Sequence, residues 1–126
     1  MEKIWKPVYS YDGYYEISNF GDIRSVDRTV NSKTNRLCRG KELKQVKDHD
    51  GYCCVQLSKS GKRKVFFIHR LVMLSFIGFN GDKIQVNHKN GIKSDNNINN
   101  LEWVTPSENT RHAWKTGLAK KRQGGF

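Results

Sequence analysis

The chain has 126 residues, a hydrophobic content of 36% and a formal net charge of +11. This length predicts one compact domain, or two small lobes that share a core. No apolar run approaches the roughly 20 residues of a bilayer-spanning helix, and the amino terminus has no apolar stretch long enough for a signal peptide. We therefore expect a soluble protein of the cytoplasm.

The positive charge is unevenly distributed along the chain. Residues 1–30 contain four Lys and Arg against five acids, whereas residues 31–126 contain 19 basic and seven acidic residues. This excess predicts a polyanionic partner, because each basic group that meets a phosphate releases a condensed counterion. No segment has the one-sided apolar face of a membrane-surface helix, so nucleic acid is favoured over anionic lipid.

The first 50 residues predict a small antiparallel sheet followed by a basic arm. Short strand-like stretches at 15–18 and 23–26 are separated by turns rich in Asp, Asn and Gly. Residues 27–47 are polar and basic, with weak apolar anchors at Leu37 and Leu43, so we expect a mobile loop that becomes ordered on a phosphate backbone. Three residues of this arm are candidates for that contact: Lys33, Arg36 and Arg39.

A hairpin and a helix are predicted next. Residues 52–57 and 63–68 have the pattern of two strands around a turn at 58–62, and residues 69–77 change to helical spacing before Gly78. The cysteines at 38, 53 and 54 are odd in number and form no C-x-x-C pair, so we expect small buried side chains and no thiolate metal site.

The candidate functional residues lie in and around a polar loop between two predicted strands. Six asparagines lie between Asn87 and Asn100, with strand residues before the loop and at 101–104 after it. A helix start follows, because Thr105 is a suitable N-cap, Pro106 suits the first helical position, and Glu108 completes a capping box. Gly117 is the expected end of this helix.

This frame can bring the end of the first strand beside the first turns of the helix. Oxygens of Asn87 and Asn109, with a nitrogen of His112, could hold a hard divalent ion. His88 could then deprotonate a water that attacks phosphorus. Asn100, at the start of the second strand, is placed to brace the loop. The remaining asparagines are expected to form turns: Asn90, Asn96, Asn97 and Asn99.

The stretch resembles the HNH nuclease motif in its ββα-metal form, found in small endonucleases of phages and of mobile introns. The three named positions of the motif fall on His88, Asn100 and Asn109, and "HRLV" at 69–72 resembles the helix that leads into it. Residues 5–25, with "YDGYYEISNFGDIRS", resemble the module that often precedes the motif in intron-associated homing endonucleases. Many relatives carry Asp at the position of Asn87, and a neutral amide binds a divalent ion more weakly than a carboxylate does.

The resemblance implies an α+β protein that cuts double-stranded DNA with Mg²⁺ or Mn²⁺, in a bacterial host cell if a phage encodes it. We expect a DNA-binding module at 1–50, a nuclease domain at 51–117 and a basic flexible tail at 118–126. His88 and Asn100 are the expected catalytic residues, with a metal held at 87, 109 and 112. The basic residues expected to contact DNA are Lys33, Arg36, Arg39, Arg70, Lys89, Lys93, Arg111 and Lys115.

Two other functions fit the same residues. One is a DNA-binding protein of this fold with weak or no catalysis, and the other is an RNA-binding module in which basic hairpins present aromatic platforms. One active site per chain favours nicking by a monomer, whereas a homodimer could cut both strands. No membrane or protein partner is expected.

Overall fold

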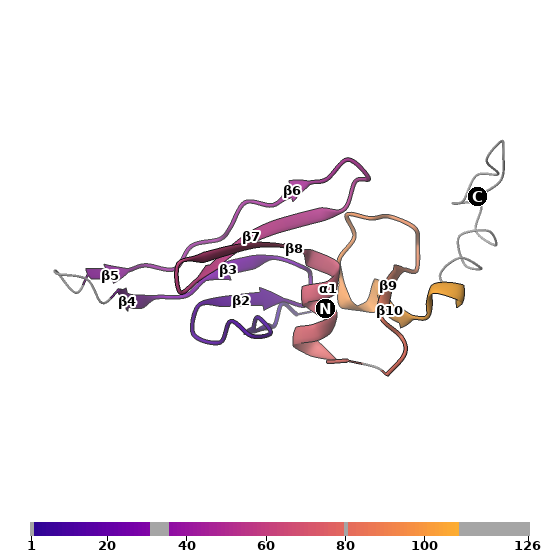
Figure 1. Ribbon diagram of the computed structural model, residues 1–126, viewed down its shortest axis with the longest axis horizontal. Coiled ribbons are helices and arrows are strands. Elements are labelled where there is room, and N and C mark those ends of the chain that lie inside the picture. Colours follow the sequence, from indigo (N-terminus) through magenta and orange to yellow (C-terminus); the bar gives the residue numbers. More distant parts are fainter. Residues whose placement is uncertain (1, 31–35, 80, 109–126) are drawn as a thin grey trace.

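The computed structural model describes residues 2–30, 36–79 and 81–108. Small antiparallel sheets pack around the helix α1, so the predicted α+β class is confirmed (Figure 1). The elements in chain order are β1 (Trp5–Pro7), β2 (Tyr15–Ser18), β3 (Ile23–Ser25), β4 (Arg28–Val30), β5 (Arg36–Cys38), β6 (Val46–Lys47), β7 (Cys53–Lys59), β8 (Lys62–Phe67), α1 (Ile68–Phe76), β9 (Gln85–His88), the 3₁₀ turn η1 (Ile98–Asn100) and β10 (Leu101–Val104).

The amino-terminal sheet has the order β1-β2-β3, with neighbouring strands antiparallel, as predicted. Ile17 lies opposite Ile23 in the register, and neither side chain is exposed to solvent. The turn before β2 contains Gly13 at φ +83°, a conformation that glycine adopts without steric cost.

The prediction of a loop over residues 27–47 is wrong in part. β4 and β5 form an antiparallel hairpin that projects from the body of the molecule, and β6 pairs with β7 (Figure 1). The base of the hairpin is closed by hydrogen bonds, because the Asp27 carboxylate accepts from the Gly40 N–H and Ser25 exchanges bonds with Lys41. These local bonds outweigh the polar composition on which the loop prediction was based.

The hairpin of β7 and β8 is confirmed, with a shorter turn than expected. Ser60 and Gly61 alone connect the strands, at φ +53° and +75°, as in the two-residue turns that match the twist of a hairpin. Inward and outward side chains alternate along β7, so Cys53 is buried and Cys54 is half-buried.

Helix α1 follows β8 without a break and supplies the centre of the core. It buries Ile68, Leu71 and Val72, and Phe76 is partly buried against the same core. It ends where Gly78, at φ +92°, donates its N–H to the Met73 carbonyl oxygen. None of the helices in the described part of the chain has the length and apolar character needed to span a bilayer.

One core joins the two halves of the chain. Ile17 and Ile23 of the amino-terminal sheet pack in the same buried cluster as Leu57, Leu71 and Trp103 from the later elements. The helix contacts β1 and β2 as well as β7 to β10. The amino-terminal sheet therefore supports the elements that carry the candidate site.

Candidate active site

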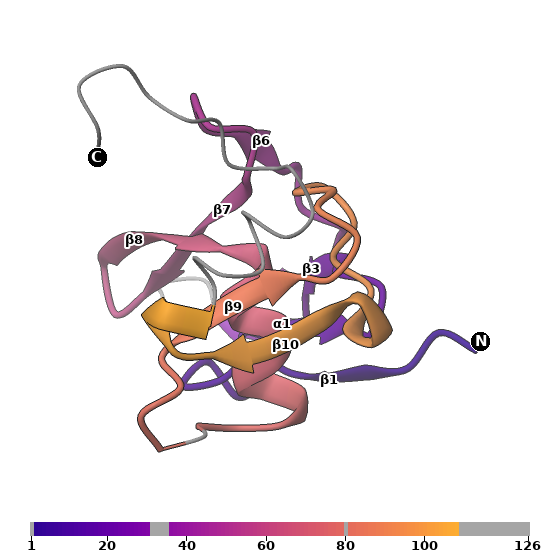
Figure 2. The same cartoon turned by 90° about the vertical axis from the view of Figure 1, so that its right-hand side faces the viewer.

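The candidate site is built on the antiparallel ribbon of β9 and β10, which lies against α1 (Figure 2). In its register His88 faces Leu101, and Asn87 faces Glu102. The asparagine-rich loop 89–100 connects the two strands. Because β9 ends and β10 begins at this loop, Asn87 and His88 lie at the loop end of the ribbon.

Asn100 holds this loop in one conformation. Its Nδ2 donates to the Asn90 side-chain oxygen and to the Asp95 carbonyl, both at 2.9 Å, and its Oδ1 accepts from the Asn90 N–H at 3.0 Å. Its carbonyl oxygen accepts from the Lys89 N–H at 2.7 Å. A single side chain thus ties both ends of the loop together.

His88 is buried at the start of the loop and is hydrogen-bonded to Asn96. Its Nε2 lies 2.9 Å from Asn96 Oδ1, and Asn96 is itself only 4% exposed. An amide oxygen only accepts, so Nε2 carries the proton and Nδ1 carries the lone pair. Burial lowers the pKa of His88, which the bond to Asn96 offsets only in part, so the ring is neutral at pH 7. This is the form that a general base requires.

The expectation that Asn96 merely forms a turn is therefore wrong. Its partner lies eight residues earlier in the chain, and only the folded loop brings the two side chains together. The other asparagines behave as expected: Asn90 Oδ1 accepts from the Ile92 N–H, and Asn97 caps η1 by accepting from the Asn99 N–H.

A second buried histidine packs against the first. The His69 ring lies 5.1 Å from the His88 ring in an edge-on arrangement, and it contacts Tyr52 and Phe67 at 5.2 and 5.3 Å between ring centres. Its Nδ1 has no hydrogen-bond partner among the described residues. Burial, with smaller contributions from His88 and Arg70, lowers the pKa of His69 from 6.5 to about 3.

We expect His69 to make the protein acid-sensitive. In the unfolded chain His69 gains a proton below pH 6.5, but in the folded protein it gains one only near pH 3. The contribution of His69 to the free energy of unfolding is therefore complete above pH 6.5 and declines as the pH falls. The loss is about 1.4 kcal/mol per pH unit, or about 2 kcal/mol at pH 5. Urea unfolding at pH 7.5 and 5.0 should show this extra loss in the wild type but not in His69→Phe. Equal losses in the two proteins would contradict it.

Asn87 is buried on the ribbon and is hydrogen-bonded across it. Its Nδ2 donates to Glu102 Oε1 at 2.9 Å, and only 6% of Asn87 is exposed. This bond fixes the amide plane, because the nitrogen must face Glu102 and the oxygen must face away from it. Amide oxygens are ligands that hard divalent ions accept, and the Glu102 carboxylate, which the sequence did not reveal, orients this one.

The two candidate functional side chains occupy opposite faces of the ribbon. Successive residues of a strand alternate, so Asn87 lies with Glu102, whereas His88 lies with Tyr52 and His69. A substrate that contacts both must bind at the open end of the ribbon, where β9 passes into the loop.

Two family models match the chain, one after the other. Residues 4–58 match the NUMOD4 motif, and residues 66–111 match the HNH endonuclease model, which includes the ribbon, the loop and the start of the following helix. The chain therefore carries an HNH endonuclease motif behind a NUMOD4 motif. The NUMOD4 match extends past residue 50 into β7, which agrees with the core shared by the two halves.

Two relatives of this chain come from a giant virus and from a phage. It is 41% identical over 116 residues to an HNH endonuclease of Acanthamoeba polyphaga mimivirus, covering 92% of this chain and 31% of the relative. It is 35% identical over 113 residues to the DNA endonuclease I-HmuI of Bacillus phage SP01, covering 90% of this chain and 59% of the relative. A solved structure of the HNH homing endonuclease I-HmuI, on DNA binding and cleavage, matches with a TM-score of 0.76 and 35% identity, over 95% of this chain and 62% of that one.

The helix of the HNH motif begins as predicted. The Thr105 N–H donates to Glu108 Oε1 at 3.1 Å, and the Glu108 N–H donates to Thr105 Oγ1 at 3.2 Å, so the capping box is confirmed. Four of the predicted site residues lie beyond residue 108, outside the described part of the chain: Asn109, Arg111, His112 and Lys115.

The predicted DNA contacts have different surroundings. Arg39 and Lys89 are exposed. Arg70 donates to the Ile84 carbonyl and lies over the Trp103 ring, and Lys93 donates to the Asp50 carbonyl and lies over Tyr52. Arg70 and Lys93 are therefore already engaged in contacts within the protein. Lys33 and the Arg36 side chain are outside what the structure describes.

A group of possible metal ligands lies in the turn at 48–50, outside the ribbon. Ligand atoms of Asp48, His49 and Asp50 lie within 4.8 Å of one another. Asp48 Oδ1 accepts from the backbone N–H groups of Asp50 and Tyr52, which is the usual bonding of a turn. His49 and Asp50 are exposed, so the turn accounts for this group.

Proposed function

We propose that this chain is a metal-dependent DNA endonuclease that hydrolyses phosphodiester bonds with His88 as the general base. The observation that carries the proposal is the buried, neutral imidazole whose Nε2–H is held by Asn96, leaving Nδ1 to accept a proton from water. General-base catalysis needs this combination of a fixed tautomer and a lone pair near the substrate. The chain spans 59% of the phage relative and 31% of the mimivirus relative.

The donor atoms on the other face of the ribbon fit a hard divalent ion. Asn87 Oδ1, which the bond to Glu102 orients, would hold it, together with Asn109 and His112 by resemblance to the family motif. When bound, such an ion stabilises the charge that develops on the phosphate and on the leaving oxygen. We assign Mg²⁺ or Mn²⁺ because both prefer oxygen ligands.

The remaining residues position the reaction. Asn96 sets the tautomer of His88, and Asn100 fixes the loop that carries both of them. Tyr52 and His69 pack against the His88 ring and limit its contact with water, and Phe67 packs against both of them. Proton transfer then occurs at Nδ1 of His88.

The substrate we assign is double-stranded DNA, in the cytoplasm of a bacterial host. The charge of +12 on residues 31–126 supports a phosphate backbone as partner. One site per chain supports nicking by a monomer, of the homing type to which the phage relative belongs.

Supercoiled plasmid provides the test. With Mn²⁺ or Mg²⁺ the protein should convert supercoiled plasmid to the open-circular form before any linear product appears, and a chelator should stop the reaction. Binding without any cleavage in either metal would support the alternative of a DNA-binding protein that retains this fold. Preference for single-stranded RNA over duplex DNA would support the RNA-binding alternative.

A further inference from the structure

One turn of the amino-terminal motif, residues 18–22, packs against the middle of the catalytic loop. Gly21 in this turn is packed directly against Asn96, the residue that holds His88. A Cβ atom at Gly21 would lie 2.7 Å from Asn96 Cβ and 3.3 Å from the Asn96 carbonyl oxygen. Real Cβ atoms essentially never approach within 3.0 Å of another atom, so only glycine fits here while Asn96 keeps its place.

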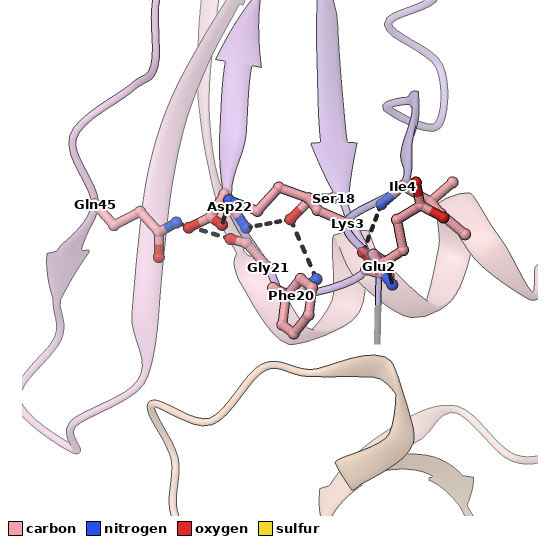
Figure 3. A network of polar contacts seen from close by, with 9 residues as sticks. Glu2, Lys3, Ile4, Ser18, Phe20, Gly21, Asp22 and Gln45 are labelled. Carbon is pink, nitrogen blue, oxygen red and sulfur yellow. Dashed lines mark hydrogen bonds and ion pairs between the residues drawn. The ribbon is translucent and has the colours of Figure 1, made fainter.

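The turn is fixed by a network of polar contacts (Figure 3). Ser18 Oγ accepts from the N–H groups of Phe20 and Asp22 at 3.1 and 3.0 Å, and Ser18 itself is fully buried. Gln45 Nε2 donates to the Gly21 carbonyl at 2.8 Å. The backbone around Gly21 is therefore held by the Ser18 bonds within the turn and by the Gln45 side chain outside it.

Asn19 extends the same network toward the loop. Its side chain accepts from the Ile4 N–H and donates to the Glu2 carbonyl, at 2.8 and 2.9 Å. Its own carbonyl oxygen accepts from the Ile98 N–H at 2.9 Å. The turn thus contacts the loop at two points. Gly21 packs against Asn96, and Asn19 accepts a hydrogen bond from Ile98.

We infer that the turn 18–22 of the NUMOD4 motif is a positioning element for the catalytic histidine, acting through Gly21 and Asn96. Asn96 touches Gly21 with its Cβ and His88 with its Oδ1, so a displacement at one end moves the other. A shift of roughly 0.7 Å along the bond would stretch the 2.9 Å contact to about 3.6 Å, which is no longer a hydrogen bond. The inference rests on the proposed role of His88 as general base.

This role differs from DNA binding by the same motif. A motif that only bound DNA would change the affinity for DNA when it was altered. A turn that positions Asn96 changes the rate of the chemical step instead, because it sets which nitrogen of His88 carries the proton. Gly21 is accordingly a positioning residue, two contacts away from the reacting water.

The test compares Gly21→Ala with Gly13→Ala. Both glycines have positive φ, +91° and +83°, so both substitutions strain the backbone in the same way, but a Cβ at Gly13 meets nothing within 4 Å. We expect Gly21→Ala to lower the cleavage rate at saturating DNA by about 10–100-fold, as losses of supporting residues commonly do. The DNA concentration for half-maximal rate should stay within about twofold. Gly13→Ala should cleave like the wild type.

Nitrogen-15 NMR of the imidazoles at one fixed pH gives a readout that does not depend on cleavage. Wild-type and Gly13→Ala protein should show His88 as the Nε2–H tautomer alone, and Gly21→Ala should show both tautomers. Retention of the single tautomer or of the wild-type rate in Gly21→Ala would overturn the inference. If the wild type has this tautomer but cuts no DNA, the proposed function fails, and the tautomer in Gly21→Ala alone decides whether the turn positions the His88 ring.

A milder variant decides the matter if Gly21→Ala does not fold. Gln45→Ala removes only the bond to the Gly21 carbonyl and adds no atom to the turn. It should shift the tautomer in the same direction and lower the rate by about 3–10-fold, a fraction of the loss typical for supporting residues. A folded Gln45→Ala protein with wild-type tautomer and rate would overturn the inference as well.

Discussion

Replacing His88 with Ala is expected to lower the rate of DNA cleavage by about 10²–10⁴-fold, the usual contribution of general-base catalysis. The affinity for DNA should stay within about twofold, because His88 is buried and neutral and contributes no charge to phosphate binding. Nicking of supercoiled plasmid under single-turnover conditions measures the first quantity, and fluorescence anisotropy with a labelled duplex measures the second.

Two further variants give this measurement its controls. His49→Ala removes an exposed histidine that belongs to neither the ribbon nor the loop 89–100 and should cut at the wild-type rate. Asn96→Ala keeps the imidazole but loses its acceptor, so its rate should lie between those of the wild type and His88→Ala. Cleavage by His88→Ala at the wild-type rate would show that another group activates the water.

Binding to duplex DNA is expected to weaken by roughly 10³-fold between 50 and 200 mM salt. About six phosphate contacts among the 19 Lys and Arg of residues 31–126 would give a slope of log K against log[salt] near −5. We expect that changing Lys33, Arg36 and Arg39 together to Gln removes three of these contacts. The slope should then fall to about −3, with no change in sequence preference, because phosphate contacts carry no base information.

The control for this triple variant lies in the amino-terminal strand region. Lys3 pairs with Asp22 at 2.7 Å, and the Lys6 ammonium lies over the Phe76 ring at 5.2 Å, so both charges are already engaged within the protein. Changing both to Gln should leave the salt slope as it is. A slope near zero in the wild-type protein would remove DNA as the partner, whatever the variants do.

Elements with strong local signals could be predicted from the sequence. The capping box at Thr105 and Glu108 and the glycine that ends α1 depend on residues within one turn of each other, so their chemistry can be read directly from the chain. The strands of the ribbon were equally clear, because β9 and β10 flank an obvious polar loop. His88 followed from these two strands and from the spacing of the motif.

The residues that were missed all depend on contacts distant in sequence. Glu102 meets Asn87 only because of the register of β9 against β10, and one residue of slip would separate them. Asn96 is one asparagine among several similar ones, and its role follows from the folded loop and from its contact with Gly21. The hairpin of β4 and β5 was missed because polar composition outweighed the strand-forming residues within it.

The pairing of an amide with a carboxylate across the ribbon also limits the order in which substitutions can accumulate there. Asn87→Asp alone would place two carboxylates where Nδ2 and Oε1 now lie 2.9 Å apart, and would remove the donor between them. Glu102→Gln alone keeps an amide pair that can still form a hydrogen bond. A lineage that acquires a carboxylate at position 87 is therefore expected to change position 102 first. The exchanged pair would then carry the same net charge as the present one, with donor and acceptor reversed.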